Sequence, residues 1–203
     1  MPDIQGMFWD VGGVLLTNGW DRVSRRAGAE RFGLDWDEFE GRHDEVSAAF
    51  ETGRLGLDDY LDRTVFHRSR TVTKQAFKEF MLAQSQPHPE ALSIAKRVAG
   101  SGNRLMATLN NESLELNLYR INRFELRRYF TLFLSSCFLG VRKPDEAIYG
   151  LALQLTQLDP ATAVFLDDRP INLECARASG MHTIHYQSPA QLQDELRRLD
   201  IHI

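Results

Sequence analysis

The chain has 203 residues, of which 43% are hydrophobic and 26% are charged, and these values exclude a disordered or collagen-like protein. The formal net charge of −4 argues against a broad nucleic-acid-binding surface. Its two cysteines, Cys137 and Cys175, lack the spacing of a disulfide framework or a zinc site. The N-terminus has no basic signal region, and no apolar stretch is long enough to span a bilayer. We therefore expect a cytoplasmic protein without a membrane span.

The first predicted element is a buried strand over residues 6–9, an apolar run that ends at Asp10 and the loop Val11-Gly12-Gly13. The next stretch, residues 17–86, shows helical periodicity and no convincing buried strand. It predicts four helices, at residues 21–31, 35–50, 57–64 and 73–83. We therefore expect an inserted helical subdomain, followed by the stiff sequence Pro87-His88-Pro89.

After residue 86, apolar strands alternate with helical patterns. The predicted strands lie at residues 104–108, 132–136, 163–166 and 181–186, and the predicted helices at residues 89–99, 114–128, 144–155 and 172–179. This alternation predicts a parallel sheet with helices on both faces and with ligands at the carboxyl ends of the strands. The expected fold is a Rossmann-like α/β core, formed by residues 1–16 and 87–203, with an all-helical cap subdomain at residues 17–86.

Polar residues that suit phosphoryl transfer occur at or just after the ends of these strands. In chain order they are Asp10, Thr108, Lys143 and the pair Asp167-Asp168. Phosphoryl transfer to a carboxylate needs a nucleophilic oxygen, further carboxylates that hold a hard cation, and positive charge with hydrogen-bond donors around the transferring oxygens. The sequence contains each of these parts. A two-component receiver domain has similar parts, but its acidic pair follows the first strand rather than a late one.

These residues closely resemble the motifs of the haloacid dehalogenase-like superfamily, and the resemblance covers nearly the whole chain. The four matching motifs are Phe8-Trp9-Asp10-Val11-Gly12-Gly13-Val14-Leu15, the strand into Thr108, Gly140-Val141-Arg142-Lys143-Pro144, and Val164-Phe165-Leu166-Asp167-Asp168. In that family a helical cap of the C1 type follows the first motif, where residues 17–86 lie here. The first motif is most similar to the subgroup with Gly-Gly or Gly-Asn after the nucleophile, which includes sugar-phosphate phosphatases.

The resemblance implies a role for each motif residue. Asp10 would be the nucleophile and a magnesium ligand, and the backbone carbonyl of Gly12 would be a second ligand. Asp168 would bind the metal directly and Asp167 through water. Lys143 would pair with the nucleophile and with phosphate oxygens, holding the carboxylate ionised. Octahedral coordination by oxygen atoms and retained waters is what Mg²⁺ favours, so the cofactor that the resemblance implies is Mg²⁺.

Phosphate binding would also involve residues at the end of the second strand. The resemblance assigns the transferring phosphoryl group to the hydroxyl of Thr108. Leu109 then departs from the family, because this position is often an Asn. Asn110 and Asn111 follow directly, and one of these amides can supply the missing hydrogen-bond donor.

A second departure lies at Gly12. In most phosphatases of the family this position is an Asp that protonates the leaving group and later deprotonates water. Glycine can do neither, so we expect the acidity of the leaving group to govern the rate. On this interpretation, Gly12→Asp should reduce the dependence on the leaving group.

The sequence therefore predicts a Mg²⁺-dependent phosphatase that acts on a small phosphorylated metabolite, such as a sugar phosphate, through an aspartyl phosphate at Asp10. Two alternatives stay open: a haloacid dehalogenase, and a catalytically weak phosphate-binding or regulatory protein. The expected partner is a small molecule rather than nucleic acid or membrane, and a homodimer is left open. Arg142 and Arg169 suit either substrate contact or a loop surface, and Trp20 and Asp21 either substrate contact or helix capping.

Overall fold

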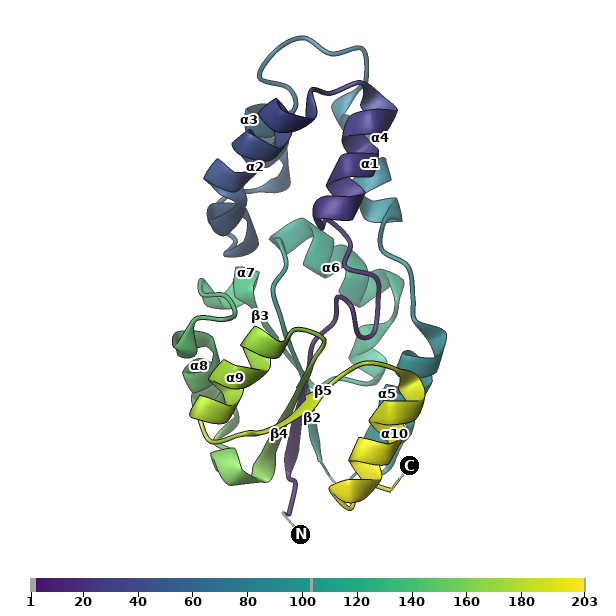
Figure 1. Ribbon diagram of the computed structural model, residues 1–203, viewed down its shortest axis with the longest axis vertical. Helices are drawn as coiled ribbons and strands as arrows, with labels where there is room; N and C mark the ends of the chain where they lie inside the picture. The colour runs from purple at the N-terminus through teal and green to yellow at the C-terminus, as the bar shows by residue number, and fades with distance from the viewer. Residues whose placement is uncertain (1–2, 103, 203) are drawn as a thin grey trace.

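The computed structural model describes residues 3–102 and 104–202 (Figure 1). Its centre is a five-stranded sheet with the order β3-β2-β1-β4-β5, in which every pair of neighbouring strands is parallel. The strands are β1 (Gly6–Trp9), β2 (Leu105–Asn110), β3 (Leu132–Ser135), β4 (Ala163–Asp167) and β5 (His182–His185). Strand order reverses beside β1, and ligands of open α/β sheets bind at such a reversal, outside the carboxyl ends of the strands. The predicted Rossmann-like α/β core is confirmed.

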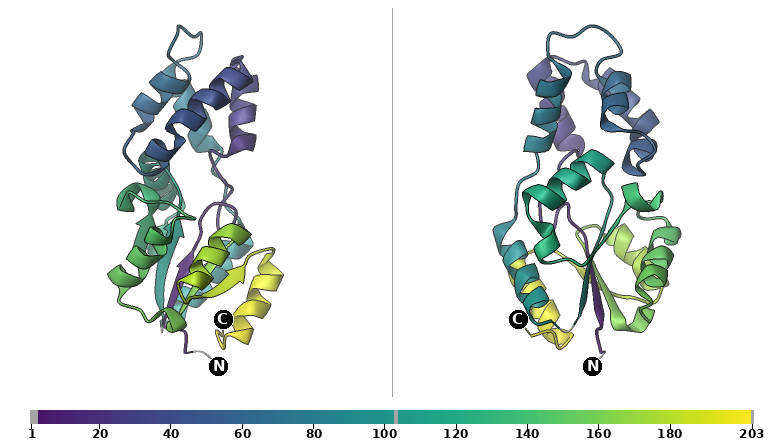
Figure 2. Two further views of the ribbon diagram at one scale, coloured as in Figure 1. Left: turned by 60° about the vertical axis from the view of Figure 1, so that its left-hand side comes forward. Right: turned by 180° about the vertical axis from the view of Figure 1, so that it is seen from behind.

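Helices cover both faces of this sheet (Figure 2). They include α5 (Pro89–Gly100) and α10 (Pro189–Arg198) on one face, and α8 (Glu146–Thr156) and α9 (Pro170–Ala178) on the other. Successive side chains of a strand point to opposite faces. Trp9 accordingly packs in the cluster beneath α5 and α10, and Phe8 in the cluster beneath α8 and α9. This alternation decides which polar side chains can reach the edge of the sheet that the carboxyl ends of the strands form.

Residues 17–86, the helical segment, stand above the carboxyl ends of the strands (Figure 1). Their helices are α1 (Arg22–Phe32), α2 (Trp36–Glu51), α3 (Leu57–Thr64) and α4 (Lys74–Ala83). Asp21, Asp35 and Thr73 cap α1, α2 and α4 through side-chain oxygens that accept from backbone N–H groups, which explains why the predicted bounds hold within one residue. The segment has its own aromatic core, in which Trp20 and Phe77 meet edge to face with centroids 5.8 Å apart.

The helices differ from the sequence prediction at three places. The expected helix over residues 114–128 is split into α6 (Leu114–Arg123) and a 3-10 turn, Leu126–Arg128, because Glu125 between them has a left-handed φ of 52°. A short helix, α7 (Ser136–Leu139), follows β3 directly. Helix α10 had no counterpart in the prediction, although Ser188 and Pro189 carry the usual helix-start signals. Within the described ranges, no helix is long and apolar enough to cross a membrane.

Candidate active site

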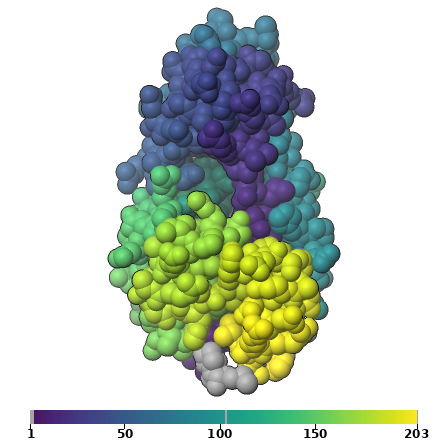
Figure 3. Space-filling model, in the orientation of Figure 1, coloured from purple at the N-terminus to yellow at the C-terminus, as the bar shows by residue number. Residues whose placement is uncertain are grey.

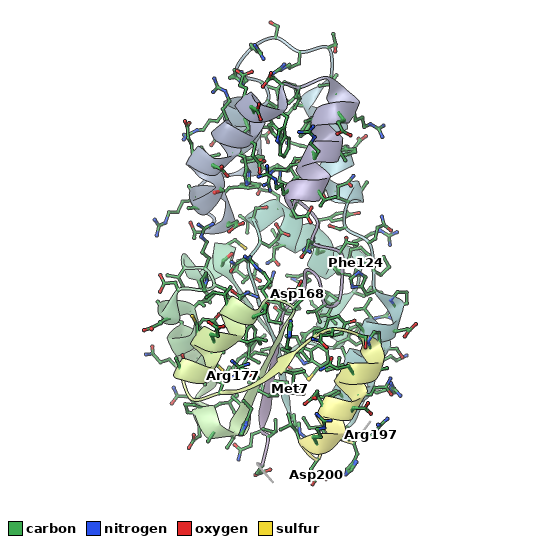
Figure 4. The ribbon with its side chains drawn as sticks, viewed as in Figure 1. Met7, Phe124, Asp168, Arg177, Arg197 and Asp200 are labelled. Atoms are coloured by element: carbon green, nitrogen blue, oxygen red, sulfur yellow. The ribbon has the colours of Figure 1, made fainter. Side chains whose placement is uncertain are left out.

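A cavity of about 540 Å³ lies between the helical segment and the carboxyl ends of the strands, and a hollow is visible there in Figure 3. Both regions contribute to its wall. The lining residues are Asp10, Gly12, Asn18, Trp20, Asp21, Arg25, Glu51, Asn111, Glu112, Arg120, Arg142, Lys143, Pro144, Asp168, Arg169 and Asn172. Figure 4 shows Asp168 at this level, above the sheet and below the helical segment.

Asp10 comes directly after the central strand β1. Its backbone N–H donates to the carbonyl of Leu166 at 2.8 Å, which extends the β1 and β4 pairing by one residue. Its carboxylate accepts from the N–H of Val11 at 2.7 Å. Burial raises the pKa of Asp10 to about 7, against the lowering effect of the Lys143 amine, and the nearby Asp167 carboxylate raises it further. A nucleophilic carboxylate here therefore depends on nearby positive charge.

Lys143 supplies part of that charge. Its amine lies 3.0 Å from Asp10 Oδ1 and 2.6 Å from Asp167 Oδ2, and the residue is 4% exposed. Asn111 holds the Lys143 backbone by two reciprocal hydrogen bonds of 2.8 Å, one to its carbonyl and one from its N–H. Burial alone would lower the pKa of Lys143, but the two carboxylates raise it above its usual value. The amine is thus a fixed cation between two carboxylates.

The acidic pair divides into one saturated and one unsaturated carboxylate. Asp167 accepts from Lys143, from the Arg169 N–H at 2.8 Å, and from the Asn172 amide at 3.1 and 3.0 Å. Asp168 lines the cavity, and its Oδ1 is buried without a hydrogen-bond partner. Burial, followed by the charge of Asp167, raises the pKa of Asp168. Gly13 permits this arrangement, because it has a φ of 76° and a Cβ there would lie 2.2 Å from Asp168 Oδ2.

These carboxylates fit a hard divalent cation. One carboxylate oxygen from each of Asp10, Asp167 and Asp168 lies within 4.8 Å of the others. The unpartnered Oδ1 of Asp168 is a buried oxygen that requires a partner, and three carboxylates beside a single lysine leave negative charge uncompensated. Oxygen donors of this type suit Mg²⁺. Gly12 lines the same cavity and belongs to the loop that begins at Asp10.

The structure does not bring every sequence-predicted residue to the cavity. Thr108 is fully buried within β2, on the face of the sheet where its register partner Trp9 packs, and its hydroxyl has no hydrogen-bond partner. Asn110 is also buried, donating to Asn117 at 3.3 Å and accepting from Ser135 at 2.8 Å. Neither residue lines the cavity, whereas Asn111 does.

Several residues in the cavity wall were missed by the sequence prediction. They are Asn18, Arg25, Glu51, Glu112, Arg120 and Asn172. For Arg120 a signal existed, since it falls one helical turn after Leu116 on the apolar face of α6, where an arginine is unexpected. Asn172 could have been found from its position near the start of the helix that follows the acidic pair.

Residues for which the sequence left two interpretations are now placed. Asp21 has both features, since it caps α1 by accepting from the Ser24 N–H at 2.8 Å and also lines the cavity. Trp20 lines the cavity beside it. Arg142 pairs with Glu51 of the helical segment at 2.7 Å, so the cavity wall includes an ion pair between the two regions.

Comparison with known proteins places this geometry in a family. The family described as haloacid dehalogenase-like hydrolase matches residues 4–180. Flavin mononucleotide hydrolase 1 of Arabidopsis thaliana is 25% identical over 173 residues, which are 85% of this chain and 69% of that protein. Acyl-CoA dehydrogenase family member 10 of Mus musculus is 41% identical over 73 residues. That match covers 36% of this chain and only 7% of the mouse protein.

Solved structures show the same fold. An enzyme of this superfamily from Bacteroides thetaiotaomicron, in complex with magnesium and inorganic phosphate, superposes with a TM-score of 0.74 at 17% identity. The superposition covers 91% of this chain and 94% of the other. With the family match over most of its length, the same fold, and a carboxylate cluster at the end of the central strand, the chain belongs to the haloacid dehalogenase-like hydrolases.

Proposed function

We propose that this hydrolase is a Mg²⁺-dependent phosphatase that acts on a small phosphorylated metabolite through an aspartyl phosphate at Asp10. The observation that carries the proposal is the Asp10 carboxylate, which lies 3.0 Å from the Lys143 amine and faces the same cavity as Asp168. The catalytic residues would be Asp10 and Lys143. A phosphate-binding role of Thr108 or of Asn110 stays a prediction, and the buried position of each residue does not support it.

Asp10 and Asp168 would hold Mg²⁺ directly, with the Gly12 carbonyl as a further ligand and Asp167 acting through water. Bound there, Mg²⁺ would neutralise negative charge on the phosphoryl oxygens. The four hydrogen bonds that already saturate Asp167 agree with a role beyond the first coordination sphere. The uncompensated charge of the cluster and the unpartnered Asp168 oxygen support the choice of a divalent cation.

The chain's own residues would carry the two chemical steps. An Asp10 oxygen attacks phosphorus and the leaving oxygen departs with the bonding electron pair, which gives the aspartyl phosphate. Lys143 favours the ionised form of Asp10 and stabilises charge on the transferring oxygens. Water then attacks the same phosphorus, releasing inorganic phosphate and restoring the carboxylate. Asn111 contributes indirectly by holding the Lys143 backbone, as its amide is used in two hydrogen bonds there.

The cavity wall favours a polar substrate such as a sugar phosphate. Ten of its sixteen lining residues carry charged side chains, and the apolar side chains are those of Trp20 and Pro144. A volume of about 540 Å³ falls in the range of small-molecule sites. The name of the Arabidopsis relative, a hydrolase of flavin mononucleotide, also describes a polar phosphate ester. The Gly12-Gly13 motif agrees with the sugar-phosphatase subgroup.

The helical segment would act as a cap that opens for substrate and closes over it. Five cavity residues come from the helical segment, namely Asn18, Trp20, Asp21, Arg25 and Glu51. Two stretches of chain connect it to the core side by side. Thr17 and Gln86 exchange backbone and side-chain hydrogen bonds of 2.9 Å across these connections, which forms a narrow hinge. Closure would exclude water and select the substrate.

A magnesium titration with p-nitrophenyl phosphate tests the proposal. We expect turnover that a chelator abolishes and added Mg²⁺ restores, together with release of inorganic phosphate. Release of halide from a 2-haloacid without any metal would instead identify a dehalogenase. Absence of turnover of any phosphate ester, with phosphate still bound, would identify a binding protein. A screen of phosphorylated sugars then tests the substrate class.

A further inference from the structure

Arg120 lies on the buried face of α6 and is only 2% exposed, yet it lines the cavity. Its Nη1 pairs with Glu112 Oε2 at 2.9 Å. Its Nε donates to Ser85 Oγ, and its Nη2 to the carbonyl of Thr17, each at 3.0 Å. A buried guanidinium is costly unless its surroundings compensate it, so this position requires an explanation. The contacts hold the side chain in one orientation.

The loop after Asp10 makes room for this guanidinium. A Cβ on Gly19 would lie 1.8 Å from Arg120 Nη2, so any larger residue there would displace the side chain. A Cβ on Gly12 would lie 3.7 Å from Arg120 Nη1 and 3.1 Å from Asn18 Oδ1. The cation therefore lies beside the position where, by resemblance, a leaving-group acid was expected and is missing.

We propose that Arg120 is a catalytic residue that places a fixed positive charge beside the oxygen that departs from phosphorus. This inference rests on the proposed phosphatase function. When the bond between phosphorus and the leaving oxygen breaks, the electron pair and the negative charge stay on that oxygen. The guanidinium stabilises this charge by a charge-assisted hydrogen bond. Solvent water then protonates the oxygen, so the overall reaction is still ester plus water to alcohol plus inorganic phosphate.

The number of available donors agrees with this role. A guanidinium has five N–H groups and keeps its proton in proteins, so it can donate hydrogen bonds but does not act as an acid. Within the described part of the chain, two of these groups donate hydrogen bonds, to Ser85 and Thr17, and Nη1 also forms an ion pair with Glu112. At least two N–H groups therefore remain for a ligand in the cavity, which the residue lines. Glu112 would then be a positioning residue that fixes the guanidinium plane.

The same geometry changes the expectation for Gly12→Asp. From sequence, the new carboxylate would supply the missing acid. In the structure it would arise next to Arg120 Nη1, 3.7 Å from a Cβ at this position, and an ion pair between the two would occupy the guanidinium that the leaving oxygen needs. We therefore expect this variant to depend on leaving-group acidity at least as strongly as the parent.

The test is a leaving-group series of aryl and alkyl phosphates with saturating Mg²⁺. The rate constant of the phosphorylation step is plotted on a logarithmic scale against leaving-group pKa for the parent, Arg120→Met and Arg120→Lys. We expect Arg120→Met to be slower by about 10²–10³-fold for alkyl esters and by less than about tenfold for acidic phenols, so its line is steeper. Arg120→Lys keeps the charge and should fall between them.

Arg123→Met is the matched control, because Arg123 lies on the exposed side of the same helix. Its line should coincide with that of the parent. A purely structural role of Arg120 would slow all substrates by one factor, and a parallel line for Arg120→Met would overturn the inference. If that variant does not fold, as judged by circular dichroism, Gly12→Asp decides the matter. A steeper or unchanged line supports the inference, and a flatter line overturns it.

The two proposals fail differently. If the parent hydrolyses none of the phosphate esters, the phosphatase function is wrong and the role of Arg120 falls with it. If the parent hydrolyses them and the Arg120→Met line is parallel, only the role of Arg120 is wrong.

Discussion

In the helical segment the buried guanidinium of Arg25 meets one carboxylate, that of Glu40, through two hydrogen bonds of 2.8 and 2.9 Å. In the core the buried amine of Lys143 meets two carboxylates, those of Asp10 and Asp167. The first arrangement has no excess of negative charge, since Glu40 also accepts from the exposed guanidinium of Arg22 at 3.2 Å, and hydrogen bonding to Arg25 lowers the pKa of Glu40. The second has an excess of negative charge, and burial raises the pKa of Asp10.

The difference separates structural charge from functional charge. A matched buried pair needs nothing further and can serve packing alone. An unmatched buried cluster is unfavourable by itself, so it indicates a missing ligand or a reaction step. Arg25 lines the same cavity as Asp10, and position in the cavity wall therefore does not distinguish the two roles. The predictions below test whether charge balance does.

The largest effect is expected for Asp10→Asn. The amide cannot act as the nucleophile, so turnover of a phosphate ester should fall by a factor on the order of 10⁴ or more. The measurement is the steady-state rate at saturating Mg²⁺. Asp37→Asn removes an exposed carboxylate from the helical segment and should leave the rate unchanged. An Asp10→Asn rate within tenfold of the parent would disprove the nucleophile assignment.

Substitutions of the two residues of the acidic pair should have different effects, one on metal binding and the other on stability. Asp168→Ala removes the unsaturated carboxylate and should abolish Mg²⁺ binding in calorimetry, with little loss of stability. Asp167→Ala should retain weaker binding but cost about 3–5 kcal/mol of unfolding free energy, because it leaves the buried Lys143 amine without its 2.6 Å partner. Urea denaturation measures the second effect. The reverse order of effects would contradict the distinction between the two carboxylates.

The sequence was sufficient for the elements that carry local signals. Apolar runs that end in Asp10 and in Asp167-Asp168 predicted two strand ends at the same edge of a parallel sheet, and capping residues such as Asp21 and Asp35 predicted helix starts within one residue. Each of these features depends on neighbours along the chain. The α/β core and the carboxylate cluster could therefore be predicted without knowledge of tertiary contacts.

The positions of Thr108 and Arg120 could not be predicted from local sequence signals. Strand β2 continues two residues beyond the predicted end, so Thr108 lies inside it and faces the side of Trp9 rather than the cavity. A shift of one residue moves a strand side chain to the other face, and no local pattern fixes that register. Arg120 reaches the cavity only because distant residues, Thr17 and Ser85, pack around it.

The two regions should respond to pH in opposite directions. With a chelator present, the Asp10 pKa rises on folding from 3.8 to about 7. The folded state then binds more protons than the unfolded state, and the stability that Asp10 contributes is full below 3.8 and lost as pH rises towards 7. In the helical segment, burial lowers the pKa of His43 from 6.5 to about 4. Its contribution is full above 6.5 and lost as pH falls towards 4.

The unfolding free energy of the parent is measured against pH, and that of Asp10→Asn or His43→Asn is subtracted from it. Each difference isolates the contribution of one residue, because the asparagine does not titrate. The asparagine introduced by His43→Asn can still accept a hydrogen bond from the Tyr60 hydroxyl, which lies 2.9 Å from His43 Nδ1. Each unfolding free-energy difference should change on the order of a few kcal/mol across its window. Curves of the same sign for both residues would contradict the opposite pKa shifts in the two regions.

The smallest effect is expected where the two regions meet, at the ion pair between Glu51 and Arg142. The pair is short, at 2.7 Å, but its side chains are 34% and 40% exposed, so water screens it. A double-mutant cycle with Glu51→Gln and Arg142→Gln should give a coupling below about 1 kcal/mol, and salt should reduce it further.

A weak coupling matters for the proposed cap, since a contact of this strength can form on closure and break at each product release. Beside this ion pair, the Ser136 hydroxyl donates a hydrogen bond of 2.6 Å to the backbone carbonyl of Glu51. The two substitutions leave this contact in place, so the closed position of the helical segment should be unchanged. Hydrogen exchange in the presence of vanadate should therefore still protect α2 in the double variant, with faster exchange than in the parent. A coupling of several kcal/mol would instead mean that the helical segment is held shut, and substrate would have to enter without its movement.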